Sequence, residues 1–175
     1  MNTRMRIGSA ADIDLLAAID LDASTLFERA GLHLAASNEH ELSMSERTRW
    51  LECLSAGTVR IADDSSGTDV GFAAVGLRDG APYLDQLSVR VSSMRQHIGT
   101  DLLYAAIQIA TEQGGNVLWL TTYGHLSWNR PYYERHGFVL VAPELCGEEI
   151  RRELSFERRL LPCPEERVIM RRLMP

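Results

Sequence analysis

The segment "YLDQLSVRVSSMRQHIGTDLL", residues 83–103, changes from a strand pattern to a helix pattern within a few residues. It begins with a strand-like stretch that ends near Val91, continues through a polar and partly basic loop, and enters a segment with helical spacing. Such a junction often binds phosphate, because the first turn of a helix has free N–H groups and a partial positive charge. The loop has only one glycine, Gly99, and a single glycine is common in ordinary turns. The loop by itself therefore leaves open a phosphate cradle and a plain strand-to-helix turn.

The segments around this junction have the patterns of further strands. Residues 58–62, "TVRIA", and 70–77, "VGFAAVGL", flank a turn-rich connection, and with residues 83–91 they predict an antiparallel meander. Residues 116–123, "NVLWLTTY", form a nearly continuous apolar run, as expected for a strand buried on both faces. Because a helix separates this run from residues 83–91, the two strands are predicted to be parallel. The pattern predicts an α+β fold, a mixed sheet with helices on both sides.

Two capping boxes are predicted in the N-terminal part of the chain. Ser9 with Asp12 resembles a box with Asp in place of Glu, at the start of one or two amphipathic helices. Residues 33–42, "HLAASNEHEL", are polar and are predicted to form a loop. Ser43 with Glu46 resembles a second capping box, which predicts that the next helix starts there.

The ends of the chain carry shorter signals. Residues 4–8 and 138–142 have the pattern of short strands, and residues 167–174 predict a last strand. Residues 130–138, "RPYYERHGF", predict a short helix with proline in its first turn and glycine at its end. Residues 147–160 are highly charged, and their pattern assigns them no structure.

Length and composition indicate one ordinary globular domain, residues 1–175, with 45% hydrophobic and 24% charged residues. The net charge of −6 disfavours a nucleic-acid partner and mildly favours cationic small molecules. There is no apolar signal segment and no run long enough to span a bilayer, so we expect a cytoplasmic protein with no membrane partner. Its three cysteines, Cys53, Cys146 and Cys163, lack metal-ligand spacing, so no metal is expected.

Two features in this order and spacing resemble the Gcn5-related N-acetyltransferase (GNAT) family. One is "LDQLSVRV" leading into "SSMRQHIGTDLL", and the other is "WNRPYYERHGF", residues 128–138, after the buried strand. The resemblance covers roughly residues 4–173. It implies an α+β fold whose mixed, mostly antiparallel sheet has a splayed parallel strand pair, with helices on both faces. It also implies acetyl-CoA as co-substrate.

The resemblance places the cofactor along the strand, the loop and the short helix. Backbone groups of Leu87 and Val89 would pair with the pantetheine amides, although both residues also suit a core. Asn129 would contact the pantetheine arm, although Asn is also a good helix cap. The loop residues implied to hold the pyrophosphate are Met94, Arg95, Gln96, His97, Ile98, Gly99 and Thr100.

This loop departs from the family pattern at two positions. Met94 stands where the family has Gln or Arg, and His97 stands at the first glycine position. Phosphate is held here mainly by backbone N–H groups, which exist whatever the side chains are. Histidine also tolerates positive φ better than β-branched residues do. We therefore expect a cradle that still binds coenzyme A.

Tyr133 is the predicted general acid, because the family's matching tyrosine faces the acetyl sulfur and a phenol can protonate a thiolate. The alternative is a core tyrosine, and the neighbouring Tyr132 is predicted only to pack. Asp85 is the predicted base, since Asp is unfavourable in mid-strand and relatives often have an acid there. The alternative for Asp85 is a solvent-facing strand residue. Further polar candidates are Glu28, His33 and His125.

The sequence thus predicts an acetyl-CoA-dependent N-acetyltransferase in which a primary amine of a small molecule attacks the thioester directly. Acetylation of a protein N-terminus or lysine is one alternative. A degenerate member that binds acyl-CoA as a sensor without turnover is another, and an unrelated α+β binding domain is a third. The acceptor cannot be read from residues 20–45, which should line its cleft. A homodimer, common in the family, is a possible assembly.

Overall fold

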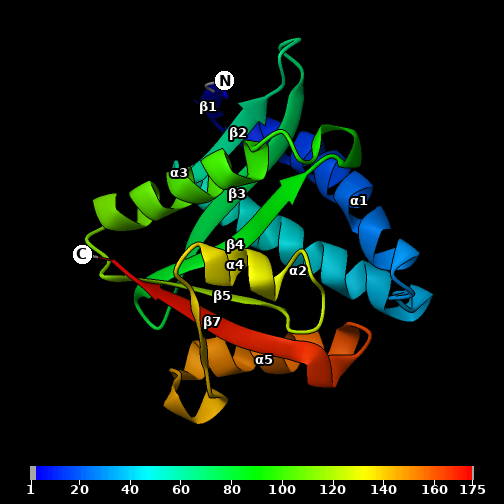
Figure 1. The fold of residues 1–175 in the computed structure, drawn as a ribbon, viewed down its shortest axis with the longest axis vertical. Helices are drawn as coiled ribbons and strands as arrows, with labels where there is room; N and C mark the ends of the chain where they lie inside the picture. The colour runs from blue at the N-terminus through cyan, green and yellow to red at the C-terminus, as the bar shows by residue number, and fades with distance from the viewer. Residues whose placement is uncertain (1–2, 175) are drawn as a thin grey trace.

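The computed structural model describes residues 3–174, whose strands form one seven-stranded sheet in the order β1-β2-β3-β4-β5-β7-β6 (Figure 1). β2, β3 and β4 form the predicted antiparallel meander, and β7 inserts between β5 and the edge strand β6. The strands are β1 (Met5–Ile7), β2 (Val59–Asp63), β3 (Asp69–Arg78), β4 (Ala81–Val89), β5 (Val117–Tyr123), β6 (Val139–Val141) and β7 (Arg167–Leu173).

Helices cover both faces of this sheet, as predicted (Figure 1). One face carries α1 and α2, whose apolar residues pack on β2 and β3, and α5, which packs on β5 and β7. The other face carries α3 and the short α4, which share a second core. The helices are α1 (Ile13–Arg29), α2 (Ala36–Ser55), α3 (Ile98–Glu112), α4 (Arg130–Arg135) and α5 (Glu148–Leu160).

The parallel strand pair is β4 and β5, and it is splayed. The two strands pair at Tyr83 and Trp119, and the rest of β4 has no ladder partner on this side within residues 3–174. Every other strand pair in the described sheet is antiparallel. The predicted fold class is therefore confirmed, and the segment after Tyr83 leaves backbone N–H and C=O groups free at a gap in the sheet.

A β-bulge at Asp85 decides which way the side chains of β4 point. Leu84 pairs with Val75 and Gln86 with Ala74, so Asp85 is the extra residue of the bulge. Because strand side chains alternate, one extra residue puts two neighbours on the same face. Asp85 and Gln86 both contact α1 or α2, while Leu87 packs in the α3 core.

Two sequence predictions need correction. Residues 33–42 are not all loop, because α2 begins at Ala36 and continues through Ser43 and Glu46. A tertiary contact holds this first turn, because the side chain of Asn38 donates to the C=O of Leu160 at 2.8 Å. Local helix propensity does not include such a contact. The predicted capping box at Ser43 therefore does not form, whereas the box of Ser9 and Asp12 is present. Residues 147–160, left unassigned, form α5 from Glu148 onward.

Three further features of the described residues bear on function. No helix within residues 3–174 is long and apolar enough to cross a membrane. Cys53, Cys146 and Cys163 are all free thiols. Across the same residues, no three His, Cys, Asp or Glu side chains gather as metal ligands would.

Candidate active site

A cleft of about 1380 Å³ runs through the gap between β4 and β5. Its wall on one face of the sheet comes from α1, α2 and the start of the α1–α2 connection. Its wall on the other face comes from the loop before α3 and from α4. Residues from both walls reach it, among them Asp20 and Glu46 on the first side and Gly99, Asn129 and Tyr133 on the second.

The loop before α3 presents a row of unused backbone donors. The N–H of Met94 donates to Val91 at 3.3 Å, and helical bonding resumes only with Asp101, whose N–H donates to His97 at 3.0 Å. Between them, the six N–H groups of residues 95–100 have no hydrogen-bond acceptor among the described residues. They stand at the N-terminus of α3, where the helix dipole is positive. Four of these residues, Arg95, His97, Gly99 and Thr100, line the cleft, and free N–H groups at a helix N-terminus are suited to binding an anion.

Of the two departures from the family pattern, His97 fits the backbone of this loop, and Met94 packs, partly buried, against the α3 core. His97 is the N-cap of α3 and has φ 65°, so histidine occupies the left-handed position that glycine usually fills. Arg95 is also left-handed, with φ 63°. Gly99 is not, and a Cβ there would meet only the Tyr132 hydroxyl at 3.7 Å and Val89 at 3.8 Å. Gly99 thus leaves open space above the cradle rather than relieving backbone strain.

The short helix α4 places Asn129 and Tyr133 at the same cleft. Asn129 is the N-cap residue, but its side chain makes no capping hydrogen bond, so it is free to face a ligand. The Tyr133 ring packs on Phe138 at 5.5 Å, and its hydroxyl has no hydrogen-bond partner within residues 3–174. Burial raises the pKa of Tyr133, so the phenol holds its proton at neutral pH. This is the state that a general acid requires.

Tyr132 packs against the α3 core, as predicted, and its hydroxyl has an unusual position that the sequence did not indicate. Its hydroxyl is buried beside Gly99, at the start of α3, and makes no hydrogen bond of good geometry to the described residues. A buried polar atom without a partner is uncommon in folded proteins. The side chain of Thr100 lies close to this hydroxyl, at the edge of the loop that has the free N–H groups.

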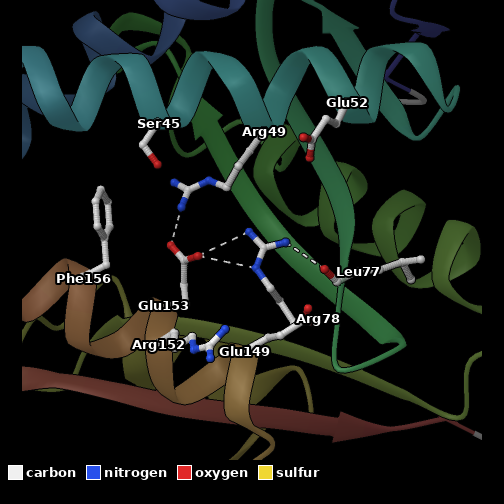
Figure 2. Close-up of a pocket in the computed structure, with 9 residues that line it drawn as sticks. All are labelled: Ser45, Arg49, Glu52, Leu77, Arg78, Glu149, Arg152, Glu153 and Phe156. Carbon is white, nitrogen blue, oxygen red and sulfur yellow. Dashed lines mark hydrogen bonds and ion pairs between the residues drawn. The ribbon is translucent and has the colours of Figure 1, made fainter.

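Asp85 lines the cleft, but its carboxylate belongs to a buried ion network. Its side chain is 2% exposed, and its Oδ1 is 2.7 Å from Arg78 Nη2 and 3.6 Å from Arg49 Nε. Both arginines also pair with Glu153 of α5, and Figure 2 shows these contacts between the three elements. Gly76 leaves room for the carboxylate, because a Cβ there would lie 2.1 Å from Asp85 Oδ2.

The network changes the role we assign to Asp85. Burial raises the pKa of Asp85, and Arg78 and Arg49 oppose that rise. A general base needs a free lone pair within reach of the substrate. Both guanidinium groups contact Oδ1, and Oδ2 accepts from Cys53 Sγ at 3.6 Å, so both oxygens have partners within the protein. The side chain is also not solvent-facing, which was the alternative. We therefore propose that Asp85 is structural, tying β4 to α2 and α5, in place of the predicted catalytic role.

The structure brings to the cleft two acids that the sequence analysis did not select, Asp20 and Glu46. Glu46 was placed at a helix cap, although its spacing from Trp50 and Cys53 puts it on the inward side of α2. Of the other candidates, Glu28 lines the cleft. His33 is exposed and does not line it, and His125 is 3.4 Å from Glu166 at the surface.

The comparisons with known proteins agree with this geometry. The model of the Acetyltransferase (GNAT) family matches residues 25–138, and the chain belongs to this family. Its fold is similar to that of the PaiA N-acetyltransferase of Thermoplasma acidophilum, solved with coenzyme A. The TM-score is 0.72 at 16% identity, over 99% of each chain. A GNAT-family acetyltransferase of Staphylococcus aureus Mu50 gives a TM-score of 0.70 at 14% identity, over 99% of this chain and 100% of that one.

A third similar structure is N-acetylglutamate synthase of Neisseria gonorrhoeae, solved with coenzyme A and N-acetyl-glutamate. Its TM-score is 0.70 at 18% identity, over 100% of this chain. The present chain spans only 36% of that synthase, so it corresponds to one part of it. The family match makes this protein a member of the GNAT acetyltransferase family, and two structures with a similar fold were solved with coenzyme A.

Proposed function

We propose that this protein transfers an acetyl group from acetyl-CoA to a primary amine of a small molecule. The observation that carries the proposal is the row of six free N–H groups, residues 95–100, beside an unpaired strand edge. The first feature suits a pyrophosphate, and the second suits the amides of a pantetheine arm. Both open into one cleft with a buried phenol, so the pyrophosphate, the pantetheine arm and the thioester of acetyl-CoA each have a matching surface.

The residues divide the binding of acetyl-CoA among them. The N–H groups of residues 95–100 hold the pyrophosphate oxygens, and Arg95 adds positive charge at the mouth of the cleft. Backbone groups of Leu87 and Val89 pair with the pantetheine amides along the free edge of β4. The side chain of Asn129, which makes no capping hydrogen bond, forms a hydrogen bond to the pantetheine arm. Met94, Gln96, His97, Ile98, Gly99 and Thr100 contribute through the backbone.

The same elements supply the chemistry. The free edge of β4 polarises the thioester carbonyl through a backbone N–H, an oxyanion-type stabilisation. The amine enters from the α1–α2 side of the sheet and attacks from the opposite side to α4. Tyr133 donates its hydroxyl proton to the departing thiolate. Holding both reactants in one cleft accounts for much of the rate.

Two other acceptors and one other role remain as alternatives to test. A protein N-terminus or lysine would need the same cleft but would show turnover with peptides and not with small amines. A sensor would bind acetyl-CoA and release no thiol with any amine. We also propose that the protein acts in the cytoplasm, where acetyl-CoA is made available to enzymes of this type.

The test is acetyl-CoA binding by titration calorimetry, followed by thiol release with a panel of small amines and short peptides. Gly99→Val is the variant of choice, because its branched side chain fills the space above the cradle while the backbone there is unstrained. We expect it to weaken acetyl-CoA binding at least tenfold, about 1.4 kcal/mol. Unchanged binding in Gly99→Val would show that the phosphate lies elsewhere.

A further inference from the structure

Two carboxyl groups face the cleft from the α1–α2 side, on separate helices. Asp20 of α1 accepts hydrogen bonds from Gln86 Nε2 and Ser88 Oγ of β4, each at 2.6 Å. Both bonds go to Oδ1, so Oδ2 has no hydrogen-bond partner among the described residues. These bonds fix the Asp20 carboxyl against the free part of β4, where the thioester would lie.

Glu46 of α2 lines the same cleft and forms no hydrogen bond or ion pair within residues 3–174. Its charged neighbours are Asp20 on α1, Arg49 on its own helix, and Glu153 and Glu157 on α5. Arg49 is the single cation among them, and it is already paired with Glu153 and Asp85. The negative charge at Glu46 is therefore not compensated by the protein.

This environment has a clear electrostatic effect. Burial raises the pKa of Glu46 to about 8, and the negative charge of Asp20 adds to the rise. Burial also raises the pKa of Asp20, against the hydrogen bonds from Ser88 and Gln86. When two carboxyl groups oppose each other's ionisation, a cation bound between them stabilises their ionised forms.

Trp50, one helical turn after Glu46, also lines the cleft and is only 2% exposed. Its indole Nε1 is enclosed and has no hydrogen-bond partner among the described residues. An ammonium group has no acceptor to offer this N–H, so Trp50 contributes apolar surface to the wall rather than a polar contact.

No free cation accompanies the two carboxyl groups on the part of this wall that the structure describes. Arg47 is paired with Asp14 at 2.8 Å, and Arg167 is paired with Glu157 at 2.8 Å. Arg49 is held in the network with Glu153 and Asp85. Among the described residues of this wall, every arginine that lines the cleft is therefore neutralised. An acceptor carboxylate would find no unpaired guanidinium on this wall, and its negative charge would oppose the ionisation that Glu46 needs to act as a base.

The mouth of this wall is apolar. Leu21 is 74% exposed and Trp128 is 41% exposed, and both border the cleft. Four more apolar side chains line this part of the cleft, namely Leu26, Phe27, Leu34 and Leu42. Exposed apolar surface at the rim of a cleft is typical of a ligand-binding groove.

We propose that the acceptor is a cationic amine with an apolar body and no carboxylate, that Asp20 holds its ammonium group, and that Glu46 removes its proton. The inference rests on the proposed acetyl transfer and names its substrate class and base. Glu46 takes one proton from R–NH₃⁺ and passes it to solvent, leaving R–NH₂. The amine nitrogen forms a C–N bond to the acetyl carbon as the C–S bond breaks. Tyr133 protonates the thiolate and recovers a proton from the nitrogen, so R–NH–acetyl, free thiol and one H⁺ result.

Matched acceptors test the charge argument. Phenethylamine, phenylalaninamide and phenylalanine share one body, and 3-methylbutylamine, leucinamide and leucine share another. Thiol release above pH 8, where Glu46 has lost its proton, should give kcat/KM at least about 10²-fold higher for each amine than for its amino acid, because the negative charge of the site opposes binding of a carboxylate. In phenylalaninamide and leucinamide a neutral amide group replaces the carboxylate, so it adds bulk without negative charge. Their kcat/KM should be closer to that of the amines than to that of the amino acids.

Variants at the acid pair test the base. Glu46→Gln should lower kcat/KM by about 10²-fold at pH 7 and less above pH 9, with unchanged acetyl-CoA affinity. The parent's kcat/KM should rise through about pH 8, as Glu46 loses its proton, and this step should vanish in Glu46→Gln. Asp20→Asn keeps an oxygen that can accept from Gln86 and Ser88 but removes a negative charge beside Glu46. The pKa of Glu46 should therefore fall, and the rise in kcat/KM should move to lower pH. Glu52→Gln is the control, because Glu52 lies on the same helix but lines the separate pocket shown in Figure 2. It should leave kcat/KM and its pH dependence unchanged.

The outcomes separate the two proposals. Failure to bind acetyl-CoA in calorimetry overturns the proposed function itself. Binding of acetyl-CoA with equal use of amines and amino acids, or with no use of either amine, overturns the acceptor class. A parent-like pH profile in Glu46→Gln overturns its role as base. Preference for amines together with loss of the pH step in Glu46→Gln supports the inference.

Discussion

Replacing Asp85 by Asn distinguishes a structural carboxylate from a catalytic one. The change keeps the shape of the side chain and its fit against Gly76. It removes one negative charge from a network of two arginines and two acids, leaving Arg49 and Arg78 opposed by Glu153 alone. Breaking a buried pair in this way costs about 3–5 kcal/mol.

The partners set where in that range the loss should fall. The side chains of Arg49, Arg78 and Glu153 are 16%, 15% and 11% exposed, so water can reach part of the network. We therefore expect the low end, about 3 kcal/mol of lost unfolding free energy. For a chain of this size that corresponds to a fall in Tm of roughly 6–12 °C.

The assay combines denaturation with kinetics. Urea unfolding and thermal melts measure the stability loss, and thiol release at a temperature well below both melting points measures turnover. Arg78→Gln in the Asp85→Asn background restores the charge balance, so it should recover part of the loss, with a coupling of at least about 1 kcal/mol. The pH dependence of kcat/KM should keep the parent's shape.

One result would refute this reasoning. If Asp85→Asn melts within about 1 °C of the parent and loses turnover mainly at neutral pH, the carboxylate takes part in proton transfer. Asp85 would then be the base first predicted from the sequence, and Glu46 would not be needed for it.

The remaining predictions concern the other wall of the cleft. Tyr133→Phe should lower turnover by about 10²-fold or more with nearly unchanged stability, because the hydroxyl has no hydrogen bond to lose. Steady-state thiol release measures the turnover and a thermal melt measures the stability. Parent-like turnover when chemistry limits the rate would exclude Tyr133 as the acid. Tyr132→Phe is the matched control and should reduce acetyl-CoA affinity a few-fold in calorimetry without a specific loss in kcat, since its hydroxyl borders the cradle. His97→Gly should keep acetyl-CoA affinity within tenfold and leave Tm unchanged or higher, because glycine adopts φ 65° without strain; a large loss of affinity would mean that the imidazole itself binds phosphate.

Local patterns determined much of this protein. Alternating and continuous apolar runs marked β2 to β5, and the change of period at residues 83–103 marked the strand, loop and α3. The spacing in "WNRPYYERHGF" marked α4 with Asn129 and Tyr133, and it carried the family resemblance that the family match confirms. These features depend on residues close in sequence, so a single chain is enough to read them.

Tertiary packing decided the rest. The start of α2 depends in part on Asn38 meeting Leu160, a contact across 122 residues. The bulge in β4 turned Asp85 toward Arg49 and Arg78, and no propensity places a bulge at one residue rather than the next. Asp20 and Glu46 lie on different helices. Burial in the fold is the main cause of the raised pKa of Glu46, and the added effect of Asp20 exists only because α1 packs against α2. The interaction between two charges depends on the distance between them, and for residues far apart in sequence only the folded chain sets that distance.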